Sequence, residues 1–293
     1  MTDFHGLATA VLENEHLRLE YLTTAGPRIV GLSYHGSPNL LADVFDMSSD
    51  TPLGKYHFLG GHRLWSSPES FEKTYIPDMS GVQVMASPNG VKLTAQSEAV
   101  SGIRKSLQLE LEAGRPAVRL VHTILNENPV PIMLAPWAIS MFKQGGTLLL
   151  PQPAGNADPQ GLLPNRFLSL WPYTRLNDAR LVLRDDFILL HAAAALPPVK
   201  VGYASTAGWM AYWRNGILFR KSFDLHPGAT YPDGGCNAET YCGDRFVELE
   251  TLGPLVSLAS GMATQLTETW EMFDGLEVPF IPTEIKELLQ KQG

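Results

Sequence analysis

The segment FVELETLGPL, residues 246–255, carries two glutamates two positions apart. Side chains on a β-strand alternate between its faces, so Glu248 and Glu250 would point the same way, roughly 7 Å apart. Val247 and Leu249 would then point the other way, into a core. In a partly dry cleft, two such carboxylates raise each other's pKa and can transfer protons. On a solvated edge strand the same pair needs no function.

A second group of reactive side chains lies in GGHRLWSSPES, residues 60–70. His62 can exchange protons near neutral pH, and Arg63 offers a planar fork of donors. Trp65 provides a flat apolar face and Glu69 an acceptor. Because sugars have polar edges and flat C–H faces, a site for them needs donors, acceptors and an aromatic platform. The alternative is a packed loop with a hydrogen-bonded histidine and a surface arginine.

The segment FDLHPGATYPDGGCNAETY, residues 223–241, adds polar side chains at close spacing. His226, Asn237 and Glu239 are its candidate sugar-binding residues. The alternative is a turn-rich surface loop held by Asp and Asn side chains. Asp233 and Glu239 have the oxygen atoms that a divalent cation uses, but no recognised metal spacing is present. We therefore expect no metal and no other cofactor.

Trp137 lies in APWAISMF, residues 135–142, and shares a strand face with Ile139. It would either fill the core, as large aromatic residues commonly do in β-sandwiches, or form a platform for a ligand. Trp137 and Glu248 complete the set of candidate binding residues.

The hydrophobic pattern that positions these residues has a period of two along most of the chain, which predicts β-strands. Alternating runs at residues 103–111 and 118–124 flank a Gly-Arg-Pro turn and predict a hairpin, and Arg214-Asn215-Gly216 predicts another. A helical pattern occurs at residues 282–293. We therefore expect an all-β protein, built as a large antiparallel β-sandwich with little helix, because so many strands cannot close one small barrel.

Proline and glycine are spread along the whole chain without a break that would mark a linker. Residues 1–293 are therefore predicted to form a single domain. The long segments 54–78 and 223–241 are expected to be irregular loops that fold over one mouth of the sandwich.

The amino-acid composition limits the classes of molecule that the protein is expected to bind. The 293 residues carry a net charge of −8 at pH 7 without a basic stripe, which argues against nucleic acid and against anionic membranes. Cys236 and Cys242 are too few for a disulfide framework and are expected to be free thiols. We see no signal-peptide pattern and no segment long enough for a membrane span, so we expect a cytoplasmic protein.

The last strands resemble the C-terminal part of aldose 1-epimerases, the galactose mutarotases. In that family, a strand that ends in a catalytic glutamate and a threonine leads through a proline-containing loop to a turn and a final alternating strand. Glu250-Thr251, Ser260-Gly261 and residues 265–273 match these positions. GGHRLWSSPE, YIPD and NAETY also resemble a group of uncharacterised mutarotase-like proteins. The resemblance implies a β-supersandwich, a small-molecule sugar as partner and no cofactor.

The resemblance also implies a mechanism, in which a glutamate takes the proton of the anomeric hydroxyl and a histidine protonates the ring oxygen. Glu250 matches the base by position. His62 lies in a Gly-Gly-His segment that resembles the family's His-Gly-Gly region with the order changed. The nearest equivalent of the family's second histidine is APWAISMF, which holds none, so His62 or His226 would replace it.

We therefore expect an aldose 1-epimerase-like isomerase that acts on a sugar by glutamate-centred proton transfer. One alternative is a non-catalytic carbohydrate-binding protein on the same fold, which would use Arg63, Trp65 and Glu239 as binding residues. A glycoside hydrolase or lyase is another, since hydrolysis uses two carboxyl groups about 5–10 Å apart.

Overall fold

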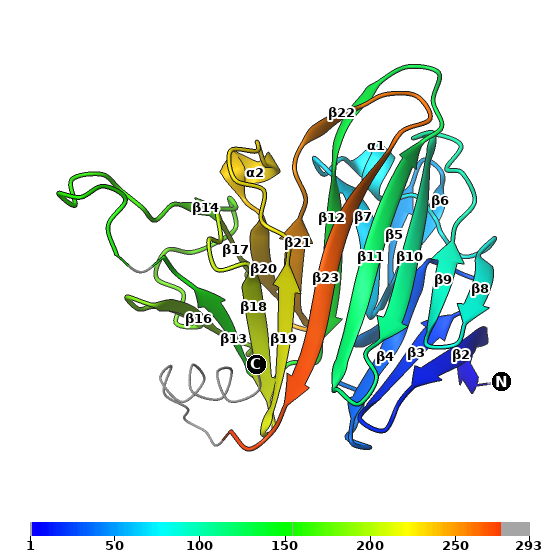
Figure 1. Ribbon diagram of the computed structural model, residues 1–293, viewed down its shortest axis with the longest axis horizontal. Coiled ribbons are helices and arrows are strands. Elements are labelled where there is room, and N and C mark those ends of the chain that lie inside the picture. Colours follow the sequence, from blue (N-terminus) through cyan, green and yellow to red (C-terminus); the bar gives the residue numbers. More distant parts are fainter. Residues whose placement is uncertain (1, 154, 277–293) are drawn as a thin grey trace.

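A computed structural model of the protein describes residues 2–153 and 155–276, and two large antiparallel β-sheets dominate this part of the chain (Figure 1). The first sheet has eleven strands, in the order β1-β2-β3-β4-β7-β12-β21-β20-β17-β14, with β22 paired to β12. Its strands are β1 (Thr2–Phe4), β2 (Leu7–Glu13), β3 (Leu17–Leu22), β4 (Arg28–Tyr34), β7 (His62–Ser67), β12 (Ile132–Phe142), β14 (Leu168–Leu170), β17 (Val199–Tyr203), β20 (Ala238–Cys242), β21 (Val247–Leu252) and β22 (Val256–Leu258).

The second sheet has ten strands, in the order β15-β16-β13-β18-β19-β23-β11-β10-β9-β8. They are β8 (Gln83–Ser87), β9 (Gly90–Thr94), β10 (Ile103–Leu111), β11 (Ala117–Asn126), β13 (Thr147–Pro151), β15 (Leu181–Leu183), β16 (Phe187–His191), β18 (Trp209–Arg214), β19 (Ile217–Phe223) and β23 (Ala263–Phe273). In Figure 1 this sheet lies in front of the first, so the two form a sandwich.

A separate hairpin and two short helices complete the regular structure of the described residues. The hairpin consists of β5 (Asp43–Thr51) and β6 (Gly54–Gly60), and the helices are α1 (Phe71–Thr74) and α2 (Pro232–Gly235). The side chain of Ser70 caps α1 by accepting a hydrogen bond from the backbone N–H of Lys73. Neither helix has the length or the apolar character needed to cross a bilayer.

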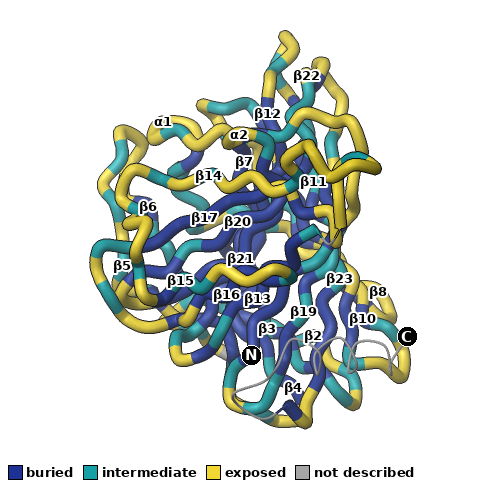
Figure 2. Tube along the Cα trace, turned by 90° about the vertical axis from the view of Figure 1, so that its left-hand side faces the viewer, coloured by how far each residue is buried: buried dark blue, intermediate teal, exposed yellow. Residues whose placement is uncertain are grey.

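The main hydrophobic core lies between the two sheets. Leu19 and Leu249 enter it from the first sheet, and Leu109 and Trp270 enter it from the second. A second cluster lies on the opposite face of the first sheet, where Trp137 packs with residues of the β5–β6 hairpin. The middle strands of the first sheet are therefore buried on both faces, as Figure 2 shows for the region around β17, β20 and β21.

The strand pattern predicted both the fold class and two of its hairpins. The all-β antiparallel sandwich is confirmed. β10 pairs with β11 as expected, and β18 pairs with β19 across a turn in which Asn215 and Gly216 both have positive φ, at 51° and 80°. This is the backbone conformation that the Asn-Gly pair favours in a two-residue hairpin. Val247 and Leu249 point into the core, also as expected.

The prediction of two irregular loops was wrong in part. Residues 54–67 form β6 and β7, because this segment finds pairing partners in β5 on one side and in β12 and β4 on the other. Residues 223–241 contain α2 and most of β20. The helix expected at residues 282–293 lies outside the described residues. Cys236 and Cys242 are buried free thiols, as expected.

Candidate functional site

A cavity of about 240 Å³ lies against the face of the first sheet that looks away from the second sheet. Its walls are largely aromatic. Its charged residues are Arg63, Glu69, Lys200 and Glu248, which come from β7, the turn before α1, β17 and β21. Alternation along these strands explains the arrangement, since Val199, Val201, Val247 and Leu249 lie in the core between the sheets. The volume lies below the usual range of about 300–1,000 Å³ for ligand sites, so the cavity holds a single small ring at most.

Two tryptophans and an arginine form one wall of the cavity. Trp65 and Trp137 face each other across β7 and β12, with ring centroids 5.4 Å apart at 67°. The guanidinium of Arg63 lies over the ring of Trp65, 4.2 Å from its centroid, and the indole N–H of Trp65 donates to the hydroxyl of Tyr56 over 3.1 Å. These contacts fix both the aromatic surface and the donor beside it.

Glu248 presents a carboxyl group whose pKa lies in the physiological range. Arg63 donates to its Oε1 over 3.2 Å. Burial raises the pKa of Glu248, the positive charge of Arg63 opposes that rise, and the charge of Glu250 adds to it, so that the pKa lies at about 7. Near neutral pH this group is therefore able both to accept and to donate a proton.

Lys200 lies between two buried carboxylates. Its Nζ is 2.9 Å from Oε2 of Glu250 and 3.0 Å from Oε2 of Glu239, and both glutamates are fully buried. The ammonium also lies over the rings of Trp137 and Trp171, 4.8 and 4.5 Å from their centroids. Burial alone would lower the pKa of Lys200, but the two carboxylates outweigh it and raise the pKa, so the lysine stays charged.

Glu250 and Glu239 face each other across β20 and β21. The indole N–H of Trp137 donates to Oε2 of Glu250 over 2.9 Å, which adds to the bond from Lys200. Burial and the charge of Glu250 raise the pKa of Glu239 well above its ordinary value, against the opposing charge of Lys200. Neither glutamate lines the cavity, which Lys200 and Trp137 separate from them.

Tyrosines complete the cavity wall. The hydroxyl of Tyr75 donates to Oε1 of Glu69 over 2.5 Å, and burial raises the pKa of this hydroxyl. Tyr173 comes from the long segment between β14 and β15, and Tyr241 comes from β20. Burial raises the pKa of Tyr241 to about 12, so its hydroxyl is a neutral donor and acceptor at any ordinary pH.

Comparisons with known proteins show the fold. No protein-family model and no curated protein matches the sequence. Among solved structures, a candidate aldose 1-epimerase from Escherichia coli K12 is 14% identical and superposes with a TM-score of 0.59 over 92% of this chain and 100% of that chain. A galactose mutarotase-like protein from Lactobacillus casei is 11% identical, with a TM-score of 0.55 over 91% and 100%. The protein has a galactose mutarotase-like fold.

A third structure, a TPR-domain containing protein from Parabacteroides distasonis, is 15% identical, with a TM-score of 0.63 over 94% of this chain and 50% of that chain. The expected mutarotase-like fold is therefore confirmed. Identities this low show the shared mutarotase-like architecture alone.

Within the mutarotase-like fold, His62 does not reach the cavity. It lies on β7 next to Arg63, and alternation sends it through the opposite face of the sheet, where it is fully buried. Its Nδ1 is 2.8 Å from the hydroxyl oxygen of Ser140, and its Nε2 is 2.7 Å from Nε2 of His122. Burial holds the pKa of His62 well below its ordinary value, so it is a neutral core residue.

Two other candidates also lie elsewhere. Asn237 is buried, and its side-chain amide bonds to the backbone N–H and C=O of Ser205, at 2.7 and 2.9 Å, so it holds a loop. His226 is exposed and does not line the cavity. The structure thus brings Arg63, Trp65, Glu69, Trp137 and Glu248 together around the cavity, with Glu239 and Glu250 directly behind Lys200.

A possible metal-binding group in the described part of the chain is formed by His62, His122 and Glu268, between the sheets. Protein partners already satisfy it. His122 Nδ1 bonds to the backbone oxygen of Leu266 over 3.0 Å, and Glu268 takes the ammonium of Lys221 at 3.1 Å. A cation beside the carboxylate disfavours a metal at this position. The group is therefore better described as a buried hydrogen-bond network.

Sequence reasoning missed Lys200, Tyr75 and Tyr173. Lys200 interrupts the apolar run VKVGY, and a lysine in the middle of a buried strand is a signal that it has a partner. Tyr75 directly follows α1, close in sequence to Glu69. Tyr173 gave no signal, because it lies outside any regular strand pattern.

Proposed function

We propose that the protein binds a free sugar in this cavity and catalyses the exchange of its anomers, as an aldose 1-epimerase-type isomerase. The observation that carries the proposal is Glu248, which lines an aromatic cavity the size of one sugar ring and has a pKa of about 7. Such a group matches proton transfer at neutral pH. Trp65 and Trp137 supply flat apolar faces for the C–H side of the ring.

In the proposed reaction, the carboxylate of Glu248 takes the proton of the anomeric hydroxyl. The bond between the anomeric carbon and the ring oxygen breaks, and its electron pair goes to the ring oxygen. Lys200 then stabilises that oxygen with a hydrogen bond, because an ammonium has three N–H donors, of which one bonds to Glu250, while Glu239 is held as an ion-pair partner. Rotation about the C–C bond next to the anomeric carbon then presents the other face of the carbonyl group to the former ring oxygen. The same steps in reverse close the ring and form the other anomer.

This proposal moves the base from Glu250, which the resemblance suggested, to Glu248. Glu250 is fully buried and holds Lys200 and Trp137 through its Oε2. We propose that it acts through Lys200, whose charge it maintains together with Glu239. Because Arg63 and Lys200 each already face a carboxylate, the cavity offers no free positive charge. We therefore propose a neutral sugar as the substrate, in preference to a sugar phosphate.

NMR measurement of anomer exchange tests the proposal. Wild type, Glu248→Gln and Glu250→Gln would be compared over a panel of hexoses, pentoses, uronic acids and hexose phosphates. We expect acceleration for one neutral sugar and its loss in Glu248→Gln. If Glu250→Gln abolishes exchange while Glu248→Gln retains it, Glu250 is the base and our assignment is refuted.

A non-catalytic sugar-binding protein is the second candidate. The observation that favours it is the position of the histidines, since neither His62 nor His226 lines the cavity. This candidate predicts that sugar resonances broaden in the presence of wild type but not of Trp65→Ala, while no anomer exchange is accelerated.

A further inference from the structure

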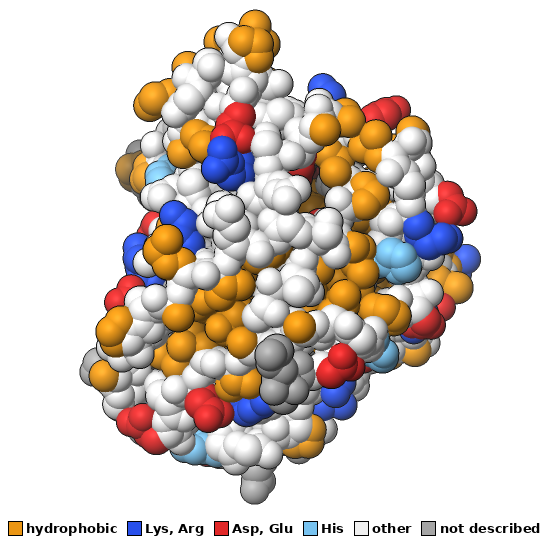
Figure 3. Space-filling view, turned by 90° about the vertical axis from the view of Figure 1, so that its right-hand side faces the viewer, with side chains coloured by type: hydrophobic (Ala, Val, Ile, Leu, Met, Phe, Trp, Pro, Cys, Tyr) orange, Lys and Arg blue, Asp and Glu red, His pale blue; other side chains and the backbone are white. Residues whose placement is uncertain are grey.

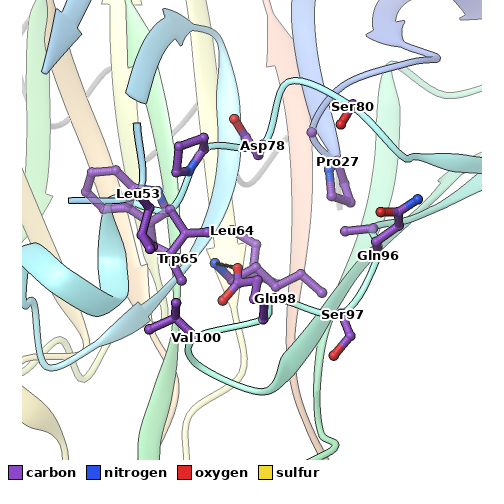
Figure 4. Close-up of a pocket in the computed structure, with 16 residues that line it drawn as sticks. Pro27, Leu53, Leu64, Trp65, Asp78, Ser80, Gln96, Ser97, Glu98 and Val100 are labelled. Carbon is purple, nitrogen blue, oxygen red and sulfur yellow. Dashed lines mark ion pairs between the residues drawn. The ribbon is translucent and has the colours of Figure 1, made fainter. Parts of the chain in front are cut away.

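A second cavity, of about 290 Å³, is drawn in Figure 4. Trp65 lines both this cavity and the first. Its floor contains Leu64, Trp65 and Lys105, which are buried. Its rim comes from the β5–β6 hairpin at Leu53, from residues 76–80 and from residues 95–100. The opening lies outside the sugar site proposed above, and nothing in that reaction uses it.

The cavity exists because two strands of the first sheet separate. β4 pairs with β7 only through Arg28 opposite Arg63 and Ile29 opposite His62. Directly before β4, Pro27 has no N–H to continue the ladder. The segment between β9 and β10 from the second sheet then closes the gap from below, tied to β10 by backbone bonds from Ala95 and Glu98. The gap therefore results from Pro27 and from the backbone hydrogen bonds that hold the segment between β9 and β10.

A buried ion pair supplies donors to this cavity. Nζ of Lys105 lies 2.6 Å from Oε1 of Glu98, and the two side chains are only 9% and 13% exposed. Ser101 donates to the other carboxylate oxygen. Within the described residues, Glu98 is the ion-pair partner of Lys105, so two of the three N–H donors of the ammonium remain for other groups. Ionised groups removed from water are costly unless their remaining donors are satisfied.

Asp78 supplies an acceptor on another side of the cavity, apart from Glu98 in Figure 4. Its Oδ2 takes a bond from Arg28 over 3.0 Å, whereas its Oδ1 is buried without a hydrogen-bond partner in the described structure. A buried carboxylate oxygen without a donor carries a desolvation cost that a bound hydroxyl group would remove. Both charged pairs are neutral overall, so the cavity attracts neither anions nor cations.

We propose that this cavity is a second binding site, for a neutral polyhydroxylated molecule up to the size of one sugar ring. One hydroxyl of the ligand accepts from Lys105 and another donates to Oδ1 of Asp78. Leu53, Leu64 and Trp65 contact its C–H groups. In Figure 3, which faces the right-hand side of Figure 1, apolar side chains gather in the middle of the surface and charged ones lie scattered around them.

The second site is connected to the first through two contacts. Trp65 contributes to both cavities. Arg28, which Asp78 holds, donates to the backbone oxygens of Phe58 and Gly60 over 2.7 and 3.1 Å, and Phe58 lines the first cavity. A ligand bound to Asp78 would therefore affect, through Arg28, the position of residues 58–60, of which Phe58 forms part of the wall of the first cavity. The second site does not depend on catalysis in the first.

NMR with methyl-labelled methionine and alanine tests the second site. Met47 lines the first cavity and Ala95 lines the second, so the two methyl groups report the two sites separately. Xylitol and D-glucose are the probes. We expect the Ala95 resonance to shift with at least one probe in the wild type.

Val100→Trp is the matched variant, because Val100 is half exposed on the rim and a larger side chain there fills the cavity. Val84→Trp is the control, the same change at an exposed valine on β8 that lines neither cavity. Loss of the Ala95 shift in Val100→Trp, with retention in Val84→Trp, supports the site. A wild type in which neither probe shifts Ala95, or an equal shift in both variants, overturns it. The Met47 signal and anomer exchange report on the first cavity whatever the outcome.

Discussion

Replacing Glu248 by glutamine changes how the stability of the protein depends on pH. Burial raises the pKa of this carboxyl from the ordinary 4.5 to about 7 in the folded state. Between these values the folded protein keeps a proton that the unfolded chain has released. The stability contributed by this proton is fully present below about pH 4.5 and is lost as pH rises through about 7. At about 1.4 kcal/mol per pH unit, the loss amounts to about 3 kcal/mol.

Glutamine cannot release a proton, so the variant escapes this loss. We expect the free energy of unfolding of Glu248→Gln, relative to wild type, to increase by about 3 kcal/mol between about pH 4.5 and pH 8. Urea denaturation at a series of pH values measures it. Glu110→Gln, at an exposed position on β10, controls for the loss of a surface charge.

Parallel stability curves for wild type and Glu248→Gln would refute the reasoning, because they would show that Glu248 titrates alike in the folded and unfolded chains. The same variant should lower the rate of anomer exchange by about 10²-fold or more, since general base catalysis contributes about that much. In wild type the rate should rise as pH passes through about 7 and Glu248 ionises.

Three further predictions concern the residues around Glu248. Lys200→Met should lower anomer exchange by about 10²-fold, while Lys200→Arg, which keeps the charge, should lose less; NMR exchange rates check both. Trp65→Ala should weaken sugar binding by about tenfold, with Trp65→Phe close to wild type, as measured by titration calorimetry. His62→Gln should lower the free energy of unfolding by about 1–3 kcal/mol through the loss of a buried hydrogen bond, yet leave sugar affinity unchanged, since His62 lies on the far side of the sheet.

Strand alternation predicted much of the fold and one part of the site. Alternation predicts that the side chain of Glu248 points to the opposite strand face from those of Val247 and Leu249. In the structure, Val247 and Leu249 lie in the core and Glu248 lines the cavity. The same rule, applied to residues 62–67, separates His62 from Arg63. The sequence interpretation treated that segment as a loop and so placed both residues in one site.

Other parts of the site depend on contacts between distant strands. Lys200 on β17 reaches Glu250 two strands away, because β20 lies between β17 and β21 in the sheet. Local periodicity contains no information on that strand order. Trp171 and Tyr173 come from a segment without a strand pattern, so only the packed structure places Trp171 over Lys200 and Tyr173 in the cavity wall.

The ion cluster formed by Glu239, Lys200 and Glu250 also determines how the strands align. A shift of β17 by one residue against β20 would turn Lys200 into the apolar core and leave two buried carboxylates without their cation. Such a misaligned sheet would be several kcal/mol less stable than the native one, by the cost of unpaired buried charges. The group that holds positive charge beside the cavity therefore also excludes incorrect strand pairings while the sheet folds.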